Sequence, residues 1–274
     1  PGEFDLINCV GVLHHTDDPI RGIQALAKKL APGGLFHIFV YGELGRWEIQ
    51  LMQRAVALLQ GDKRGDYKDG VKVGRQIFAS LPENNRIVKR DKERWSLENH
   101  RDENFADMYV HPQEIDYNID TLFELIDASG LEFVGFSNPG FWDLQTLLGK
   151  SPELMERAEG LTERQRYRLI ELLNPETSHY EFFLARPPLN KANWSSNSIL
   201  LSAIPEVSPC IDGFPSQTIF NYDYKIVNLS NAELAFMQAC DSSKSVDEIL
   251  KSVDFNLDGV RRLLTQQLIM MAPM

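Results

Sequence analysis

Two apolar runs that flank an amphipathic segment near the start of the chain constrain its fold more than any other feature. Residues 4–12 ("FDLINCVGV") and 35–41 ("LFHIFVY") are apolar on both faces, which is typical of parallel strands covered on both sides. Four apolar residues between them recur at helical spacing: Ile20, Ile23, Ala27 and Leu30. The sequence therefore predicts a strand, a helix and a second strand, which together imply a parallel sheet.

Residues that cap and terminate helices mark the ends of this predicted helix. Asp17 and Asp18 can accept hydrogen bonds from the first helical amides, and Pro19 suits the first turn. The sequence "APGG" (31–34) follows the last apolar position, so we expect it to end the helix.

The next segment combines a helical pattern with a polar stretch. A helix is predicted over 43–60, with its apolar face made by Leu44, Trp47, Leu51, Ala55 and Leu58. Residues 61–104 are polar and mixed in charge, and we expect a solvated, partly ordered insertion there. The basic run "RIVKRDKER" (86–94) leaves a docking strip open as an alternative.

Regular patterns return later in the chain. A helical stripe ends at Gly130 and leads into an apolar strand at 131–137. A last apolar strand, "HYEFFLA" (179–185), ends before two prolines. The predicted sheet then has four strands, two on each side of a long helical insertion. We therefore assign residues 1–187 to one α/β domain, with the insertion at about 43–117.

The remaining residues, 188–274, follow a different pattern. Residues 189–228 are rich in Ser, Asn and Pro and are weakly periodic, as in a linker. Two capping boxes then begin short helices: Ser230 with Glu233, and Ser245 with Glu248. With a third apolar stripe near the C-terminus, the pattern predicts a small helical or winged-helix module.

Charge and cysteine content exclude several classes of protein. The net charge of −11 argues against broad affinity for nucleic acid or anionic membranes, and no apolar run is long enough to span a membrane. Residues 189–274 carry six Lys and Arg against nine Asp and Glu, so a protein or peptide partner, or a structural role, fits them better than DNA. Cys9, Cys210 and Cys240 form no CxxC motif, and we expect a cytoplasmic protein with structural thiols.

The segment "FDLINCVGVLHHTDDPIRGIQALAKKLAPGGLFHIFVYG" (4–42) resembles the second half of the class I S-adenosylmethionine-dependent methyltransferases. The matching features, in order, are an F-D-x-I strand, the "VLHH" turn, a helix carrying "LAPGG" and the strand after it. In that fold a sixth strand and an antiparallel seventh complete the sheet, and the strands at 131–137 and 179–185 look like these two. The resemblance spans residues 1 to about 187 and implies a Rossmann-like methyltransferase sheet with a helical insertion over the active site.

The chain departs from that family in one respect. Enzymes of the class hold the methionine part of the cofactor with a glycine-rich turn after their first strand, and the ribose with an acidic residue after the second. No G-x-G-x-G or G-x-G-x-x-G occurs in this sequence, which begins at Pro1. We therefore expect the chain to be the C-terminal portion of a longer enzyme and to be inactive alone.

His14 and His15 directly follow the first strand, at the sheet edge where open α/β folds bind their ligands. Adjacent side chains diverge and no third ligand lies at metal spacing, so "HHTDD" predicts no metal site. The resemblance implies that His14 or His15 lies close to the transferred methyl group, as a base or a positioning residue. Alternatively, one histidine packs or caps and the other lies on the surface. The resemblance also places four strand residues near S-adenosylmethionine: Asn8, Cys9, Val10 and Gly11.

Five further residues are candidates for acceptor binding: Tyr41, Arg46, Asp107, His111 and Tyr117. Tyr41 and Arg46 follow the second strand and should face the same crevice, although a surface position on the next helix is the alternative for Arg46. The others belong to "ADMYVHPQEIDY" (106–117), which either contacts the substrate or forms a loop tied down by hydrogen bonds. His179 and Glu181 alternate along the last strand and should share one face.

Methyl transfer from S-adenosylmethionine to a small-molecule acceptor is the function that the sequence predicts. A non-catalytic binding or regulatory protein that keeps half of the methyltransferase fold is the alternative.

Overall fold

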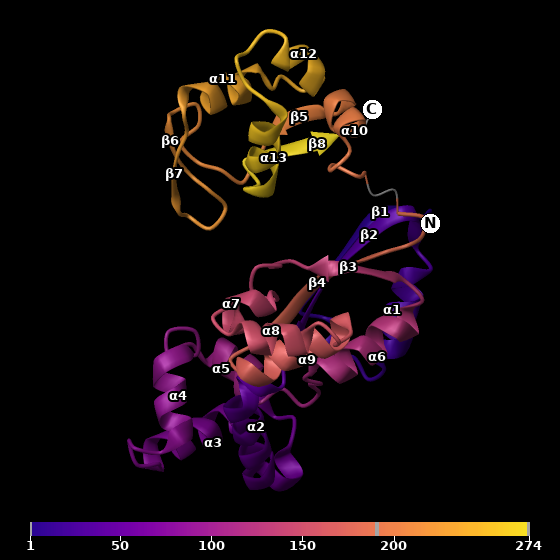
Figure 1. Cartoon of the computed structure of the whole chain (residues 1–274). Coiled ribbons are helices and arrows are strands. Elements are labelled where there is room, and N and C mark those ends of the chain that lie inside the picture. The colour runs from indigo at the N-terminus through magenta and orange to yellow at the C-terminus, as the bar shows by residue number, and fades with distance from the viewer. Residues whose placement is uncertain (1, 190–191, 273–274) are drawn as a thin grey trace. The chain divides into compact units, whose positions relative to one another are not determined.

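The computed structural model describes residues 2–189 and 192–272. The chain divides into two compact units, Pro1–Leu189 and Asn190–Met274 (Figure 1). The sequence pattern placed the boundary two residues earlier. None of the helices among the described residues is long and apolar enough to cross a membrane.

A four-stranded sheet organises the first unit. Its strands are β1 (Phe4–Val10), β2 (Leu30–Tyr41), β3 (Glu132–Phe136) and β4 (His179–Ala185), in the spatial order β1-β2-β4-β3. β1 and β2 are parallel, and β4 runs antiparallel to both of its neighbours. The sheet therefore contains both parallel and antiparallel pairs of strands. Its last strand is antiparallel, as the sequence resemblance implied.

The sequence "APGG" does not end the first helix as expected. Helix α1 (Pro19–Ala27) ends earlier, and β2 already begins at Leu30, which is the register partner of Phe4. The next pair in the register is Leu6 with Leu35, so residues 31–34 form a bulge inside β2. Gly33 adopts a positive φ of 78° in this bulge, which explains the need for glycine there.

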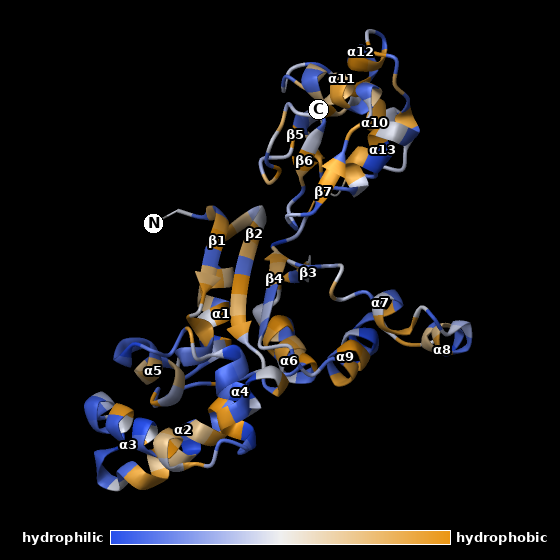
Figure 2. Cartoon of the chain, turned by 90° about the vertical axis from the view of Figure 1, so that its left-hand side faces the viewer, coloured by the Kyte–Doolittle hydropathy of each residue, from blue (hydrophilic) through white to orange (hydrophobic). Residues whose placement is uncertain are grey.

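Among the described residues, helices cover one face of the sheet. The sequence predicted strands covered on both sides, and this expectation was wrong. α1, α6 (Ile119–Ser129) and α9 (Glu163–Leu173) lie on that face. Alternate residues of each strand join their core, including Cys9, Ile38 and Phe182. The intervening residues of β1 point the other way, and Figure 2 shows β1 and β2 as largely hydrophobic strands.

The insertion between β2 and β3 is a helical layer with its own core, not a partly ordered segment. It contains η2 (Leu44–Arg46), α2 (Trp47–Gln60), η3 (Gly61–Lys63), α3 (Tyr67–Ser80), α4 (Arg86–Arg94) and α5 (Asp102–Tyr109). The apolar face expected for α2 was wrong, because Leu51 and Leu58 are exposed. Ile49, Met52 and Val56 are buried instead, one helical turn apart along a neighbouring stripe.

Two of the five basic residues of α4, Arg90 and Arg94, have partners inside the protein, whereas the others are exposed, so a docking strip stays a prediction. Arg90 donates to the buried carboxylate of Glu48 at 3.2 Å and also pairs with Glu176, in the loop before β4. Arg94 donates to the carbonyl oxygen of Gly45 at 3.2 Å. Because these partners come from α2 and from the β4 side, the arginines fasten the insertion to the sheet.

Local side-chain caps and a glycine delimit the helices of the first unit, as the sequence predicted for α1 and α6. Asp18 caps α1, and Gly130 ends α6 at a positive φ of 70°. Ser151 caps α8 (Pro152–Ala158), and Thr162 forms a capping box with Gln165 at the start of α9. The short helices η1 (Leu13–His15) and α7 (Leu144–Leu148) complete the unit.

The second unit contains strands as well as helices, so it is not an all-helical module. Its elements are α10 (Asn197–Ser202), β5 (Ile204–Val207), β6 (Thr218–Phe220), β7 (Ile226–Asn228), α11 (Asn231–Ala239), α12 (Val246–Leu250), α13 (Leu257–Thr265) and β8 (Ile269–Ala272). β5 pairs antiparallel with β8, and β6 with β7. Residues 189–228 were expected to be weakly structured, yet they supply α10 and three of these strands. Both predicted capping boxes are present; the winged-helix assignment stays a prediction.

Candidate active site

Four aromatic rings gather at the carboxyl ends of β1 and β2. η1 follows β1 and carries both histidines, whereas Tyr41 ends β2. The ring centroid of His14 lies 4.2 Å from that of His15 and 4.1 Å from that of Tyr41, and His15 lies 4.0 Å from His111. The predicted residues from three separate segments are thus neighbours at the edge where α/β sheets bind ligands.

His14 is the buried member of the histidine pair. Its side chain is 0% exposed, and neither ring nitrogen has a hydrogen-bond partner. The pKa of His14 is lowered from 6.5 to about 3, chiefly by burial and in smaller part by the charges of His15 and Arg46. His14 is therefore neutral near neutral pH and packs between Tyr41 and His15.

His15 is half-buried and has the geometry of a base. Its Nδ1 lies 3.0 Å from the carbonyl oxygen of Gln113, which can only accept a hydrogen bond. Nδ1 therefore carries the proton in the neutral ring, and Nε2 keeps its lone pair. Of the two predicted catalytic histidines, His15 is the one whose tautomer leaves a proton acceptor near the surface.

Arg46 is buried beneath this cluster and has internal partners. Its guanidinium lies 3.5 Å from the centroid of the Tyr41 ring. It donates to Glu114 at 3.0 Å and lies 3.6 Å from Asp116. The alternative of a helix-surface charge is therefore wrong, and the charge of Arg46 is offset by two carboxylates of this chain rather than awaiting an acidic substrate.

Glu114 and Asp116 form an acidic pair that the sequence analysis missed. Both side chains are at least nine-tenths buried, and they accept hydrogen bonds from Gln53 at 3.0 Å and from Gln50 at 2.7 Å. Burial raises the pKa of Asp116 from 3.8 to about 7, and the charge of Glu114 adds to the effect. Their spacing in the sequence could have predicted the pair, because residues i and i+2 of an extended segment point to the same side.

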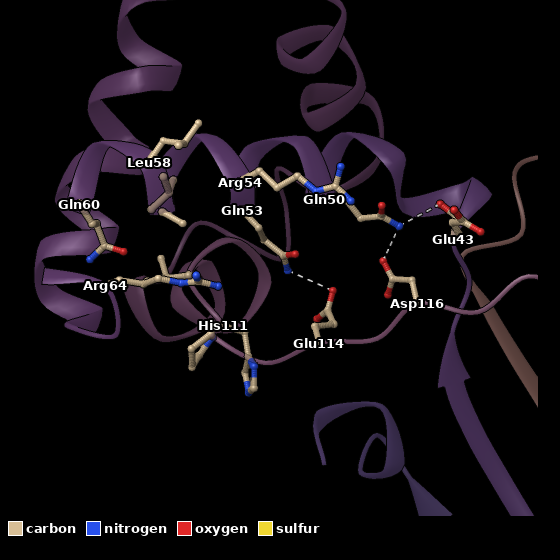
Figure 3. A pocket seen from close by; sticks show the side chains of 14 residues that line it. Glu43, Gln50, Gln53, Arg54, Leu58, Gln60, Arg64, His111, Glu114 and Asp116 are labelled. Carbon is tan, nitrogen blue, oxygen red and sulfur yellow. Dashed lines mark hydrogen bonds between the residues drawn. The ribbon is translucent and has the colours of Figure 1, made fainter. Parts of the chain in front are cut away.

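Two cavities flank the cluster. The first has a volume of about 680 Å³ and lies between α2 and residues 110–116 (Figure 3). His111, Glu114 and Asp116 line it from below, and Gln50 and Gln53 from α2. The second, of about 510 Å³, is lined by Tyr41, Arg46 and Asp107, together with Trp95, Met108 and His179.

The predicted acceptor-binding residues separate into three groups. Tyr41, Arg46 and Asp107 share the second cavity, and His111 lines the first. Tyr117 lines neither cavity, because its side chain is buried in the core of the sheet. Its backbone instead joins the insertion to β2, through hydrogen bonds with Tyr41 and Glu43. For Tyr117 the alternative of a loop tied down by hydrogen bonds is the one that the structure supports.

The predicted cofactor residues lie at the end of β1 and differ in what they offer. Cys9 points into the core, where burial raises the pKa of its thiol, so its side chain is not available to a ligand. Asn8 points to the opposite face and hydrogen-bonds to His37 at 2.7 Å. Gly11 has a positive φ of 71° and no atom within 4 Å of the place where a Cβ would be. The half-exposed turn after Val10 therefore leaves open backbone, as a closely bound cofactor requires.

His37 and Glu181 extend the polar line that begins at Asn8 across the uncovered face of the sheet. His37 pairs with Glu181 at 2.8 Å, and Glu181 accepts from Ser137 at 2.7 Å. His179 stacks on Phe39 on the same face. The expectation that His179 and Glu181 share one face is met. Among the described residues no group of three or more His, Cys, Asp or Glu side chains is arranged to hold a metal ion.

Comparison with known proteins supports the fold. No model of a known protein family matches the chain. It is 57% identical to an uncharacterized protein of Synechococcus sp. over its whole length, and spans 66% of that relative. Its fold matches that of PKMT2 from Rickettsia typhi, with a TM-score of 0.60, 12% identity, and coverage of 98% of this chain and 58% of that one. A second structure, PKMT2 in complex with AdoHcy, matches with 13% identity and the same coverage and TM-score. The chain therefore has a methyltransferase-like fold.

Proposed function

We propose that this chain forms part of an S-adenosylmethionine-dependent methyltransferase that modifies a small molecule. The observation that carries the proposal is the position of β4, which lies antiparallel between β2 and β3 in a sheet that matches a methyltransferase fold. The clustered polar side chains at the carboxyl ends of β1 and β2 support it, because that edge is where such sheets bind ligands.

The open turn at Val10 and Gly11 and the exposed side of β1 would contribute to the cofactor site. S-adenosylmethionine would supply there a methyl group activated by its sulfonium charge. The chain spans 66% of the Synechococcus relative and contains no glycine-rich turn. We therefore propose that a glycine-rich turn outside these 274 residues provides the rest of the cofactor site, and that the chain alone is inactive.

His15 is the proposed base or positioning residue. A substrate that must lose a proton needs a base within hydrogen-bond reach, and Nε2 of His15 keeps its lone pair because Nδ1 donates to the Gln113 carbonyl. The aromatic neighbours Tyr41 and His111 restrict the motion of the ring. Orientation of the acceptor and exclusion of water are the main demands of this kind of transfer.

Calorimetry with S-adenosylmethionine tests the proposal. We expect weak or no binding by the 274-residue chain and clear binding by a chain extended upstream to the length of the relative. Strong binding by the 274 residues alone would overturn the proposal of an external turn. No binding by either chain would favour the alternative, a non-catalytic protein that keeps half of the fold.

Substitution of His15 tests its role within the extended protein. His15→Asn keeps a donor for the Gln113 carbonyl but removes the base, so we expect kcat to fall roughly 100-fold while cofactor binding is unchanged. His100→Asn is the matched control, because the exposed His100 makes the same kind of bond to a backbone carbonyl. Unchanged methyl transfer in His15→Asn would remove His15 from the mechanism.

For the second unit we propose a docking role toward protein or peptide. The excess of Asp and Glu over Lys and Arg disfavours binding to phosphates. The β6–β7 hairpin exposes Tyr222, Tyr224 and Ile226, which gives the unit an apolar contact surface. A salt-dependent mobility shift of the chain with duplex DNA would contradict this proposal.

A further inference from the structure

The first cavity combines a buried acidic end with an apolar wall. Glu114 and Asp116 lie at its inner end, on the extended segment that faces α2 (Figure 3). Five apolar residues also line it: Val56, Ala57, Leu58, Val110 and Pro112. A cavity of about 680 Å³ has room for a small organic molecule.

Among the described residues, two carboxylate oxygens at the acidic end have no hydrogen-bond donor, and the buried Arg46 Nε has no acceptor. Glu114 Oε1 accepts from both Arg46 and Gln53, and Asp116 Oδ2 accepts from Gln50. Glu114 Oε2 and Asp116 Oδ1 are buried and have no hydrogen-bond partner, although Arg46 Nε lies 3.6 Å from the latter. A buried carboxylate oxygen without a donor is costly, so this end is suited to a ligand that brings N–H groups and positive charge.

The basic residues of the lining do not reverse this preference. Arg46 is the cation buried at the acidic end, and its charge is shared between two carboxylates. Arg46 does not line this cavity, whereas Arg54 and Arg64 do; both are exposed, so solvent screens their charge. An anion would meet buried carboxylates at the inner end, whereas a cation there completes their hydrogen bonds.

We propose that this cavity binds an aliphatic amine in its ammonium form, with the N–H groups on Glu114 and Asp116 and the alkyl chain against Val56 and Val110. The identity of this amine as the methyl acceptor rests on the proposed function, whereas its binding does not. As the acceptor, the ammonium would first give a proton to the proposed base His15; the freed nitrogen lone pair would then attack the methyl carbon, and the S-adenosylhomocysteine thioether would leave. His111 connects the cavity to the proposed base, because it lines the cavity and its ring centroid lies 4.0 Å from that of His15.

Binding of three six-carbon probes to the 274-residue chain tests the charge preference in the absence of any methyl donor. We expect hexylamine and 6-aminohexanoate to shift the NMR signals of residues that line the cavity, and hexanoate to leave them unchanged. Binding of hexanoate without hexylamine would overturn the proposal. Hexylamine binding by the 274-residue chain, combined with no methyl transfer by the extended chain in the presence of S-adenosylmethionine, would refute the proposed function alone.

The substitution Glu114→Gln tests whether the carboxylate of Glu114 contributes to amine binding. The variant keeps an oxygen for Arg46 and Gln53 but places an NH₂ group where Oε2 is, so hexylamine should bind at least about tenfold more weakly. Glu124→Gln is the matched control on the exposed side of α6, and should bind hexylamine like the parent chain. Equal affinity in all three proteins would overturn the assignment of Glu114.

Asp116→Asn provides a second variant if Glu114→Gln fails to fold, and it too should weaken hexylamine binding. An acetylated lysine tripeptide distinguishes the source of the amine. Tighter binding of the tripeptide than of hexylamine would identify the ligand as a lysine side chain of a protein. Tighter binding of hexylamine would identify it as a free amine. Both results support binding of an ammonium group. Binding of neither overturns it.

Discussion

At the scale of single residues, His14 links the candidate site to the stability of the fold. The pKa of His14 is about 3 in the folded chain and 6.5 when unfolded, so the folded state resists protonation of this ring. Its contribution to stability is complete above pH 6.5 and is lost progressively as the pH falls toward 3. The neutral imidazole is thus a condition for the packing of Tyr41 and His15 around it.

We expect this linkage to appear in unfolding experiments. Between pH 7.5 and 5.5, His14 alone should reduce the free energy of unfolding by about 1.4 kcal/mol. His14→Phe keeps an aromatic ring against Tyr41 but does not titrate, so the variant should lack this part of the pH dependence. Urea unfolding at both pH values measures the difference between the two proteins; identical pH dependence would contradict the prediction.

Gly45 is a second residue whose importance depends on close packing. A Cβ at this position would lie 2.3 Å from the backbone carbonyl of Thr177, in the loop before β4. We expect Gly45→Ala to lower the free energy of unfolding by about 3 kcal/mol, because backbone on both sides must move. Gly160→Ala is the control, since no atom lies within 4 Å of its Cβ position, and it should change stability by less than about 0.5 kcal/mol. Similar losses of stability in both variants would show that the close approach of Gly45 to the Thr177 carbonyl is not the cause.

At the scale of elements, β1 is an edge strand with apolar side chains in solvent. Among the described strands it pairs with β2 alone, and Phe4, Leu6 and Val10 are all about half exposed or more. An open strand edge with apolar side chains favours pairing with another chain. The described fold therefore has an exposed apolar strand edge.

We expect the chain to self-associate through β1. Leu6→Lys should shift sedimentation velocity profiles toward the monomer at high protein concentration, because a lysine opposes edge-to-edge pairing. Leu97→Lys is the matched control, since Leu97 is 89% exposed but lies in the insertion, away from the strand edge. If the two substitutions reduced self-association equally, the cause would be a general gain in solubility and not the loss of pairing at the β1 edge.

At the scale of the whole molecule, the chain contains two separate cores. Phe182 belongs to the core of the sheet unit and Phe236 to the core of the second unit, and both are fully buried. Small and medium domains unfold cooperatively on their own cores. The chain should therefore behave as two units in thermal unfolding.

Calorimetric scans of two variants test that expectation. Phe236→Ala should destabilise one transition by about 4 kcal/mol and leave the other in place, and Phe182→Ala should do the reverse. If either variant lowers both transitions equally, the two cores unfold as one cooperative system.

The sequence alone determined the elements whose signals are local. The bounds of β4, the glycine end of α6 and the capping boxes at Thr162, Ser230 and Ser245 all follow from hydrophobic period and side-chain capping within a few residues. The same local signals placed His14 and His15 at the end of a strand, at the sheet edge where open α/β folds generally bind ligands.

Only the tertiary structure decided which of those residues meet, and which face water. Arg46 is paired with Glu114, 68 positions away in the chain, and His14 is buried by Tyr41 from another strand. The sequence of β1 predicts a strand covered on both sides, yet five of its seven residues are exposed in the described structure. Local sequence fixes what a segment can form, whereas burial, pKa and pairing depend on groups that the fold brings together from distant positions.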